Sequence, residues 1–142
     1  MPVQAYVNFN GNCREAVTFY AEVFNLPLPN MMTYGSMPPD PDFTISDEAR
    51  DLVMHAELRI CEGNVMFGDV PPGMPFSAGN SVGLVVISKD MDELKAYFHK
   101  MKEGGTVDMD LQETFWSKCY GSVVDKFGIN WQFSHDSGIM PG

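Results

Sequence analysis

The sequence shows the same order of secondary-structure signals twice, and this repetition limits the folds open to it more than any other feature. In the first half, the strand pattern AYVNFN leads directly into a helix with a capping box, Asn12 with Glu15, and an apolar stripe. In the second half, a strand over 81–87 leads into a helix capped by Asp90 with Glu93 and ended by two glycines. A repeat of this length indicates two similar modules that pair to share one core.

Further strands are predicted after each helix. They lie at about 27–34, 54–60 and 64–70 in the first half and at 106–110, 113–123 and 129–134 in the second. Tight turns are expected at Glu62-Gly63 and over 125–128. The predicted fold class is therefore α+β, with two β-α-β-β-β modules that form a curved, mostly antiparallel sheet with the helices on its outer face.

The whole chain, 1–142, is expected to fold as a single domain, because 142 residues can bury a core without metal or disulfide bonds. Module 1 covers about 1–70 and module 2 about 80–136. An acidic, proline-rich stretch at 35–51 interrupts module 1 and is predicted to be a mobile loop. The stretch 71–80 is predicted to connect the modules.

The charge of the chain argues against several classes of partner. Nineteen acidic residues against nine basic ones give a net charge of −10, which repels nucleic acid and anionic membrane surfaces. No stretch reaches the roughly 18 to 20 apolar residues of a membrane span, and the N-terminus lacks a basic region followed by an apolar one. We therefore expect a cytoplasmic protein that binds neither nucleic acid nor membrane.

Four segments carry a resemblance to a known superfamily. The segments FNGNCREAVTFY, HAELRI, QETFW and VVDKFGINWQFS resemble the vicinal-oxygen-chelate superfamily, which includes glyoxalase I, extradiol dioxygenases and bleomycin-resistance proteins. Within it they look like the PhnB-like branch, often labelled as a 3-demethylubiquinone-9 3-methyltransferase domain. The resemblance implies a homodimer. The chain has no glycine-rich strand-to-helix turn to hold an adenosyl cofactor, so methyl transfer is not predicted.

The resemblance also implies a position for a metal, on the first and last strands of each module. The matching positions here lie near Gln4, Met66, Ser81 and Gln132. Amides, a hydroxyl and a thioether are poor ligands for zinc, nickel or iron, so no metal and no other cofactor is predicted at these positions. The three cysteines lack paired metal-binding spacing and are expected to be reduced structural thiols.

Alternation along the strands predicts a polar concave face. Along 54–60 the apolar side chains point toward the helices, so His55, Glu57 and Arg59 lie on the opposite face. The expected ligand pocket combines this face with polar and aromatic side chains of other strands. Its members are Tyr6, Asn8, Glu57, Met66, Phe115, Trp116, Tyr120, Asn130 and Gln132.

Two residues are candidates for catalysis, His55 and Glu113. His55 can act as a base or as a ligand of a relocated metal, with Glu57 or Glu113 as the carboxylate that orients it. Glu113 is expected at the start of a strand whose aromatic residues line the pocket. The alternative is a structural network in which His55 and Glu57 pair with Arg59 and with neighbouring strands.

Three functions are compatible with this pattern. The first is a metal-independent binding protein for a partly apolar or aromatic small molecule, held in the concave cavity. The second is a lyase or isomerase that uses His55 and Glu113, with or without a relocated divalent metal. The third is a dimer whose own side chains fill the cavity.

Overall fold

The computed structural model describes residues 3–36, 38, 46–71 and 73–137. The chain divides into two compact units, unit 1 (Met1–Ser77) and unit 2 (Ala78–Gly142). The boundary between the units falls inside the predicted connection at 71–80. That the two units form one domain stays a prediction.

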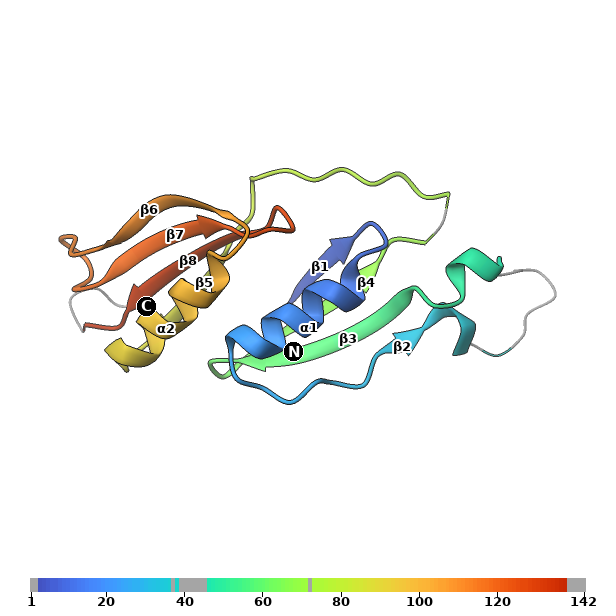
Figure 1. Ribbon diagram of the computed structural model, residues 1–142, viewed down its shortest axis with the longest axis horizontal. Coiled ribbons are helices and arrows are strands. Elements are labelled where there is room, and N and C mark those ends of the chain that lie inside the picture. Colours follow the sequence, from blue (N-terminus) through green and yellow to red (C-terminus); the bar gives the residue numbers. More distant parts are fainter. Residues whose placement is uncertain (1–2, 37, 39–45, 72, 138–142) are drawn as a thin grey trace. The chain divides into compact units, whose positions relative to one another are not determined.

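Unit 1 has a helix packed on one face of a four-stranded sheet (Figure 1). Its elements are β1 (Ala5–Phe9), α1 (Cys13–Val23), β2 (Met32–Thr33), the 3-10 helices η1 (Tyr34–Ser36) and η2 (Asp47–Ala49), β3 (Val53–Ile60) and β4 (Gly63–Asp69). The strand order is β1-β4-β3-β2, in which β1 and β4 are parallel and the other neighbours antiparallel. The helix contacts β3 and β4, so the other face of the sheet is left open by α1.

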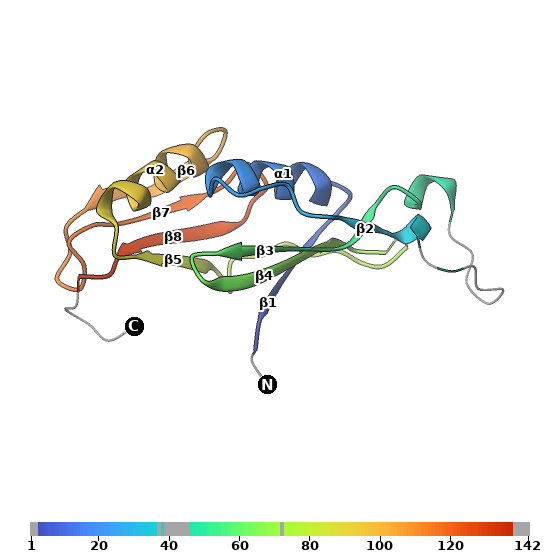
Figure 2. The same cartoon turned by 90° about the horizontal axis from the view of Figure 1, so that it is seen from below.

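Unit 2 repeats this arrangement (Figure 2). Its elements are β5 (Leu84–Ser88), α2 (Met91–Met101), β6 (Thr106–Gln112), β7 (Tyr120–Val124) and β8 (Asn130–His135). The strand order is β5-β8-β7-β6, again with the first pair parallel and the others antiparallel. The predicted α+β class with two β-α-β-β-β units is confirmed, whereas the joining of both sheets into one curved sheet stays a prediction.

Aromatic side chains fill the space between each helix and its sheet. In unit 1, Tyr20 of α1 packs against Phe9 and Phe67, with ring centroids 6.5 and 5.6 Å away. In unit 2, Phe98 of α2 meets Phe133 edge-to-face at 5.7 Å. All five rings are at most 2% exposed, and burying a side chain of this size contributes about 1.5–3 kcal/mol. The apolar stripe of each helix therefore packs against the aromatic side chains of its own sheet.

A buried carboxylate, Asp69, joins three segments of unit 1. Its Oδ1 accepts hydrogen bonds from the backbone N–H groups of Gly11 (2.9 Å) and Cys13 (3.0 Å), and its Oδ2 accepts one from Val53 (2.9 Å). The hydroxyl of Tyr34 donates to the backbone oxygen of Asp69 at 2.7 Å. Since Asp69 is only 4% exposed, these donors replace the water that its charge would otherwise require.

The helix α1 begins after Asn12 as predicted, but this carboxylate replaces the predicted capping hydrogen bonds. Asn12 occupies the N-cap position, but its side chain makes no capping hydrogen bond, so the predicted capping box with Glu15 is wrong. Asp69, distant in sequence, supplies the acceptor instead. At α2 the prediction is confirmed, since the Asp90 side chain accepts from the Glu93 N–H at 3.1 Å.

A second buried carboxylate, Asp125, organises the β7–β8 turn of unit 2. Its Oδ1 accepts from the N–H groups of Phe127 and Ile129, and its Oδ2 accepts from the Trp131 indole at 2.9 Å. The Gly128 N–H donates to the Asp125 carbonyl at 2.9 Å, which confirms the predicted turn over 125–128.

Two predicted strands are much shorter in the structure. The strand expected at 27–34 is reduced to β2, Met32–Thr33, and the strand expected at 113–123 is reduced to β7, which begins at Tyr120. Pro27 and Pro29 lack an N–H, which confines such a segment to a sheet edge or to irregular structure. In the second case, the Thr114 N–H and the Ser117 carbonyl close a turn at 2.8 Å.

Two further boundaries shift by one to three residues. The strand expected at 81–87 is β5, Leu84–Ser88. The hairpin turn expected at Glu62-Gly63 consists of Cys61 and Glu62, because Ile60 pairs with Gly63. Cys61 and Glu62 have φ values of 47° and 71°, as a two-residue type I′ turn requires.

The predicted loop at 35–51 lies partly outside the described residues. Its two ends are held together, since Tyr34 N–H donates to the Leu52 carbonyl (3.1 Å) and Gly35 N–H to the Arg50 carbonyl (3.0 Å). A Cβ at Gly35 would lie 2.9 Å from the Arg50 carbonyl oxygen, so this close approach requires glycine. The mobility of the loop stays a prediction.

Neither helix in the described part of the chain is long and apolar enough to cross a bilayer. A cytoplasmic location stays a prediction.

We predict that Asp69→Ala lowers the free energy of unfolding by about 3 kcal/mol, because three buried N–H groups lose their acceptor. Chemical denaturation followed by far-UV circular dichroism measures the change. Asp108→Ala, at an exposed position of β6, is the matched control and should change it by less than about 0.5 kcal/mol. Equal effects of the two substitutions would contradict the role given to Asp69.

Candidate functional site

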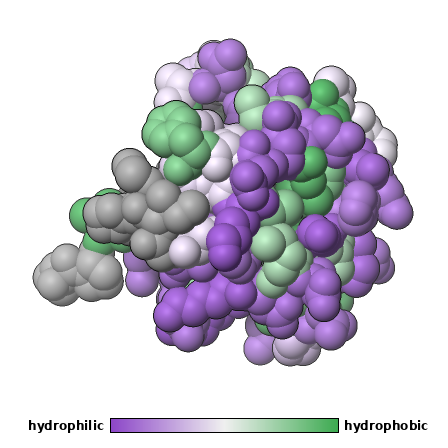
Figure 3. Space-filling model, turned by 90° about the vertical axis from the view of Figure 1, so that its left-hand side faces the viewer, coloured by the Kyte–Doolittle hydropathy of each residue, from purple (hydrophilic) through white to green (hydrophobic). Residues whose placement is uncertain are grey.

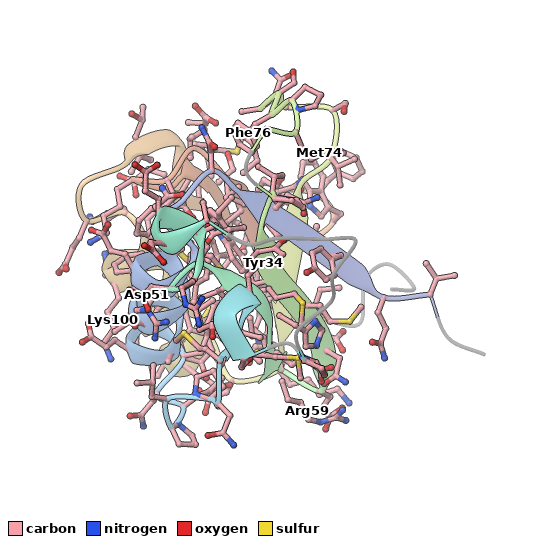
Figure 4. All side chains as sticks on the ribbon, turned by 90° about the vertical axis from the view of Figure 1, so that its right-hand side faces the viewer. Tyr34, Asp51, Arg59, Met74, Phe76 and Lys100 are labelled. Atoms are coloured by element: carbon pink, nitrogen blue, oxygen red, sulfur yellow. The ribbon has the colours of Figure 1, made fainter. Side chains whose placement is uncertain are left out.

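The open face of the unit 1 sheet presents the polar residues that alternation predicted. Along β3, Ala56, Leu58 and Ile60 are buried, whereas His55 is half-buried and Glu57 is exposed. Arg59, also exposed, lies near the hairpin end of β3 and projects outward (Figure 4). The predicted assignment of faces along this strand is confirmed.

Three predicted site residues form a row across the strands of this face. In the register of the sheet, Tyr6 on β1 is paired with Met66 on β4, and Met66 is paired with Glu57 on β3. Asn8 is exposed two positions after Tyr6 on the same strand face. Unit 1 thus brings together Tyr6, Asn8, His55, Glu57 and Met66 on one face.

His55 is held by its neighbours on this face. Its Nε2 lies 3.0 Å from Glu57 Oε1, and its ring centroid lies 6.0 Å from that of Tyr6. Among the described residues this is the one ion pair with His55, so the predicted network with Arg59 is absent there. The carboxylate that orients His55 is therefore Glu57.

The position of Tyr6 depends on a glycine. The Tyr6 hydroxyl crosses β4 at Gly68 and donates to the Met54 carbonyl at 2.8 Å. A Cβ at Gly68 would collide with the Tyr6 hydroxyl oxygen and with the Met54 carbonyl oxygen. Burial raises the pKa of Tyr6, and the electrostatic effects of Cys13 and Asp69 raise it further, so the hydroxyl stays a donor at neutral pH.

A groove of about 510 Å³ lies beside β3. The chain between α1 and β2 forms one wall, and β3 forms the other. The lining residues are Pro29, Asn30, Met31, Met32, His55, Ala56 and Glu57. Sequence reasoning found His55 and Glu57 but missed the residues at 29–32, because this segment was expected to be a strand; its two prolines were the available signal.

In unit 2 the predicted pocket residues form a second group. The Tyr120 hydroxyl donates to Gln132 Oε1 at 2.6 Å, and the Trp116 ring meets Tyr120 and Phe115 edge-to-face at 5.2 and 4.8 Å. Burial raises the pKa of the Tyr120 hydroxyl. Asn130 shares the open face of β8 with Gln132.

Two residues of this second group are placed differently from the prediction. Glu113 is exposed in the loop after β6 and does not begin a strand, so that prediction is wrong. Phe115 is 80% exposed in the same loop, where it contacts Trp116. Figure 3 shows the molecule from the side where β6 and β7 lie in Figure 1, with hydrophobic residues scattered among hydrophilic ones. Pairing of Glu113 in unit 2 with His55 in unit 1 stays a prediction.

The positions implied for a family-type metal do not fit one. Met66 and Gln132 occupy equivalent positions in β4 and β8, where they pair with Tyr6 and Val85. Gln4 precedes β1 and Ser81 precedes β5, so neither lies in the strand to which it was assigned, and Tyr6 and Val85 take the positions beside Met66 and Gln132. The phenol and thioether in unit 1, and the isopropyl group and amide in unit 2, are each poor donors to a divalent metal. In the part of the chain that the structure describes, no three His, Cys, Asp or Glu side chains lie close enough to share a metal.

The three thiols differ in their surroundings. Cys13 and Cys119 are buried, as expected of structural thiols, but Cys61 is exposed at the β3–β4 turn. Burial, with a smaller contribution from Asp69, raises the pKa of Cys13 to about 12. Burial also raises the pKa of Cys119, against the opposing charge of Lys95. Neither buried thiol is therefore a nucleophile at neutral pH.

Solved structures define the class of protein to which this fold belongs. Protein PA1353 from Pseudomonas aeruginosa is 30% identical to the chain, with a TM-score of 0.83 over 95% of this chain and 97% of that one. A glyoxylase/bleomycin resistance protein/dioxygenase domain from Frankia sp. EAN1pec has a TM-score of 0.61 at 11% identity, over 95% and 90% of the two chains. The fold is that of the glyoxalase/bleomycin-resistance class.

The particular family follows from the sequence match. The family described as 3-demethylubiquinone-9 3-methyltransferase matches residues 2–134, and the chain belongs to it. Protein YjdN of Escherichia coli (strain K12) is 29% identical over 140 residues, which cover 94% of this chain and 95% of that protein. The predicted superfamily and its PhnB-like branch are confirmed.

We predict that Gly68→Ala displaces the Tyr6 ring from His55 and lowers the free energy of unfolding by about 1–3 kcal/mol, because the added methyl group overpacks the crossing with Tyr6. The ring-proton chemical shifts of His55 in NMR spectra report the displacement. Gly63→Ala is the control, because its added Cβ meets only the Ile60 carbonyl oxygen at 3.4 Å. Unchanged His55 shifts in Gly68→Ala would contradict this interpretation.

Proposed function

We propose that the protein binds a partly apolar or aromatic small molecule, without a metal, in the groove beside β3 of unit 1. The observation that carries the proposal is the groove itself, whose volume of about 510 Å³ accommodates a drug-sized molecule and whose wall contains the oriented His55–Glu57 pair. A cavity with apolar walls and a few fixed polar groups is the usual form of a small-molecule site.

The apolar part of the groove comes from Pro29, Met31 and Met32. Met32 is 52% exposed, so a ligand that covers it removes apolar surface from water. Methionine side chains adjust their shape easily, and their sulfur atoms make favourable contacts with aromatic rings. This wall favours a flat or aromatic group and tolerates variation in its outline.

The polar part of the groove fixes the orientation of the ligand. When the hydrogen on His55 Nε2 is donated to Glu57, the neutral ring carries a lone pair on Nδ1 that accepts from a ligand. The Glu57 carboxylate has further acceptor capacity, and Asn30 has both a donor and an acceptor. We infer that the ligand has at least one hydrogen-bond donor next to its apolar group.

A second candidate function is proton transfer by a lyase or isomerase, with His55 as the base. The 3.0 Å contact between His55 and Glu57 favours it, because a base oriented by a carboxylate is a recurring catalytic arrangement. Of the two carboxylates that the sequence offered to orient His55, Glu57 and Glu113, Glu57 has this role here. A relocated metal is a weaker variant, since this pair supplies two donors and a tetrahedral site needs three or four.

A screen of aromatic fragments against the protein with ¹³C-labelled methionine methyl groups tests the proposal. Ligands are expected to shift the Met31 and Met32 signals, assigned through Met32→Leu. His55→Ala or Glu57→Gln should then weaken binding by about 1–3 kcal/mol, because each removes a fixed polar group. Arg59→Ala, on the same face but outside the groove, is the control and should leave affinity unchanged.

Two outcomes would count against the binding function. Fragments that shift methionine signals elsewhere but never those of the groove would show that the site is in another place. Turnover of a bound compound that His55→Ala abolishes would replace the binding protein with the enzyme. Homodimer formation, which the resemblance implies, stays a separate prediction.

A further inference from the structure

We infer that the groove binds a peptide-like ligand, one with a secondary amide in an extended chain that adds to the outer edge of β3. This inference rests on the proposed function and specifies its ligand class. The observation behind it is an incomplete ladder. Among the described residues, β2 pairs with β3 only at Met32↔His55 and Thr33↔Val53, whereas β3 continues to Ile60. Figure 1 shows β2 beside one end of β3 only.

The direction of the backbone groups follows from the β3–β4 hairpin. A two-residue turn is flanked by a pair that exchanges both hydrogen bonds, here Ile60 and Gly63. Every second residue of β3 before Ile60, namely Leu58 and Ala56, therefore also bonds to β4. The N–H and C=O groups of Glu57 and Arg59 point to the opposite edge, beyond the last pair with β2, Met32↔His55.

The groove lies against this open edge. Its walls are the outer side of β3 at His55, Ala56 and Glu57 and the chain at 29–32. If the ladder continued, Met31 and Asn30 would pair with Ala56 and Glu57, but among the described residues β2 and β3 pair no further in this direction than Met32↔His55. The space between them is where an added strand would lie.

An extended amide chain satisfies the chemistry of this edge. One residue of such a chain, placed opposite Glu57, donates its N–H to the Glu57 carbonyl and accepts from the Glu57 N–H. Because it lies opposite Glu57, the side chain of this residue lies on the open face, beside His55 and Met32, and the side chains of its neighbours in the ligand lie on the opposite face of the sheet. Main-chain bonds provide affinity, and the methionine wall selects an apolar or aromatic side chain.

The occupant is a short free ligand because the groove is small. A volume of about 510 Å³ holds a blocked dipeptide or an amide-containing small molecule of similar size. The charged side chains of Glu57 and Arg59 stand on the same strand and discourage edge-to-edge pairing with a long strand of another chain. Pairing with a second copy of this chain is an outcome of the test below.

The test compares two probes, N-acetyl-phenylalanine N-methylamide and its analogue methylated at the phenylalanine amide nitrogen, by isothermal titration and methionine methyl NMR. The parent probe should shift the Met31 and Met32 signals, and methylation should weaken binding at least about tenfold, because it removes one ladder donor. Equal binding of the two probes would refute the ladder and leave the groove as a site. Binding of neither these probes nor any aromatic fragment would refute the proposed function as well.

A pair of variants tests the same point from the protein side. Glu57→Ala removes the carboxylate and keeps the backbone N–H, whereas Glu57→Pro removes both. Because the ladder to β4 does not use this N–H, the fold tolerates proline at this edge position. The parent probe should bind Glu57→Pro at least about fivefold more weakly than Glu57→Ala. Equal affinities would contradict the inference. It would also be contradicted if native mass spectrometry showed a dimer joined through this edge that does not bind the probe. If Glu57→Pro does not fold, the comparison of the two probes on the natural chain decides.

Discussion

The Asp69 carboxylate determines how the parts of unit 1 meet. It lies at the end of β4 and accepts N–H groups from the β1–α1 turn and from the first residue of β3. A charge buried to 4% exposure is stable only when such donors are in place, so the turn, the strand and the helix start form together. Because Val53 is one of the donors, Asp69 also fixes where β3 begins, and with it the face on which His55 and Glu57 lie.

The two units share a topology but present different chemistry on their open faces. At equivalent positions, unit 1 has Tyr6 and Met66, and unit 2 has Val85 and Gln132. The titratable pair and the described groove belong to unit 1, and the Trp116–Tyr120 ring contact belongs to unit 2. Asp69 accepts hydrogen bonds at the end of β4 in unit 1, whereas Asp125 accepts them after the end of β7 in unit 2. The two units therefore share the same strand order but have different side chains on the open faces of their sheets.

Much of the fold could be predicted from the sequence because alternation and helical periodicity are local signals. They placed both helices, assigned Ala56, Leu58 and Ile60 to the core, and put His55 and Glu57 on the open face. The N-cap position of α1 was predicted, but its capping acceptor could not be, because Asp69 is 56 residues from Cys13. The groove was missed since a break in the ladder at 29–31 depends on how far β2 follows β3, and the two prolines of this segment signal an irregular strand without fixing where the pairing ends.

The most direct test of the account is native-state amide hydrogen exchange along β3 in the ligand-free protein. The account predicts slow exchange at Ala56 and Leu58, which bond to β4, and fast exchange at Glu57 and Arg59, which face the open edge. The four residues are consecutive in one strand, so each amide that faces the open edge is compared with a direct neighbour that bonds to β4. Protection of Glu57 and Arg59 equal to that of Ala56 and Leu58 would mean that the edge is already covered, and the groove could not serve as the binding site proposed for it.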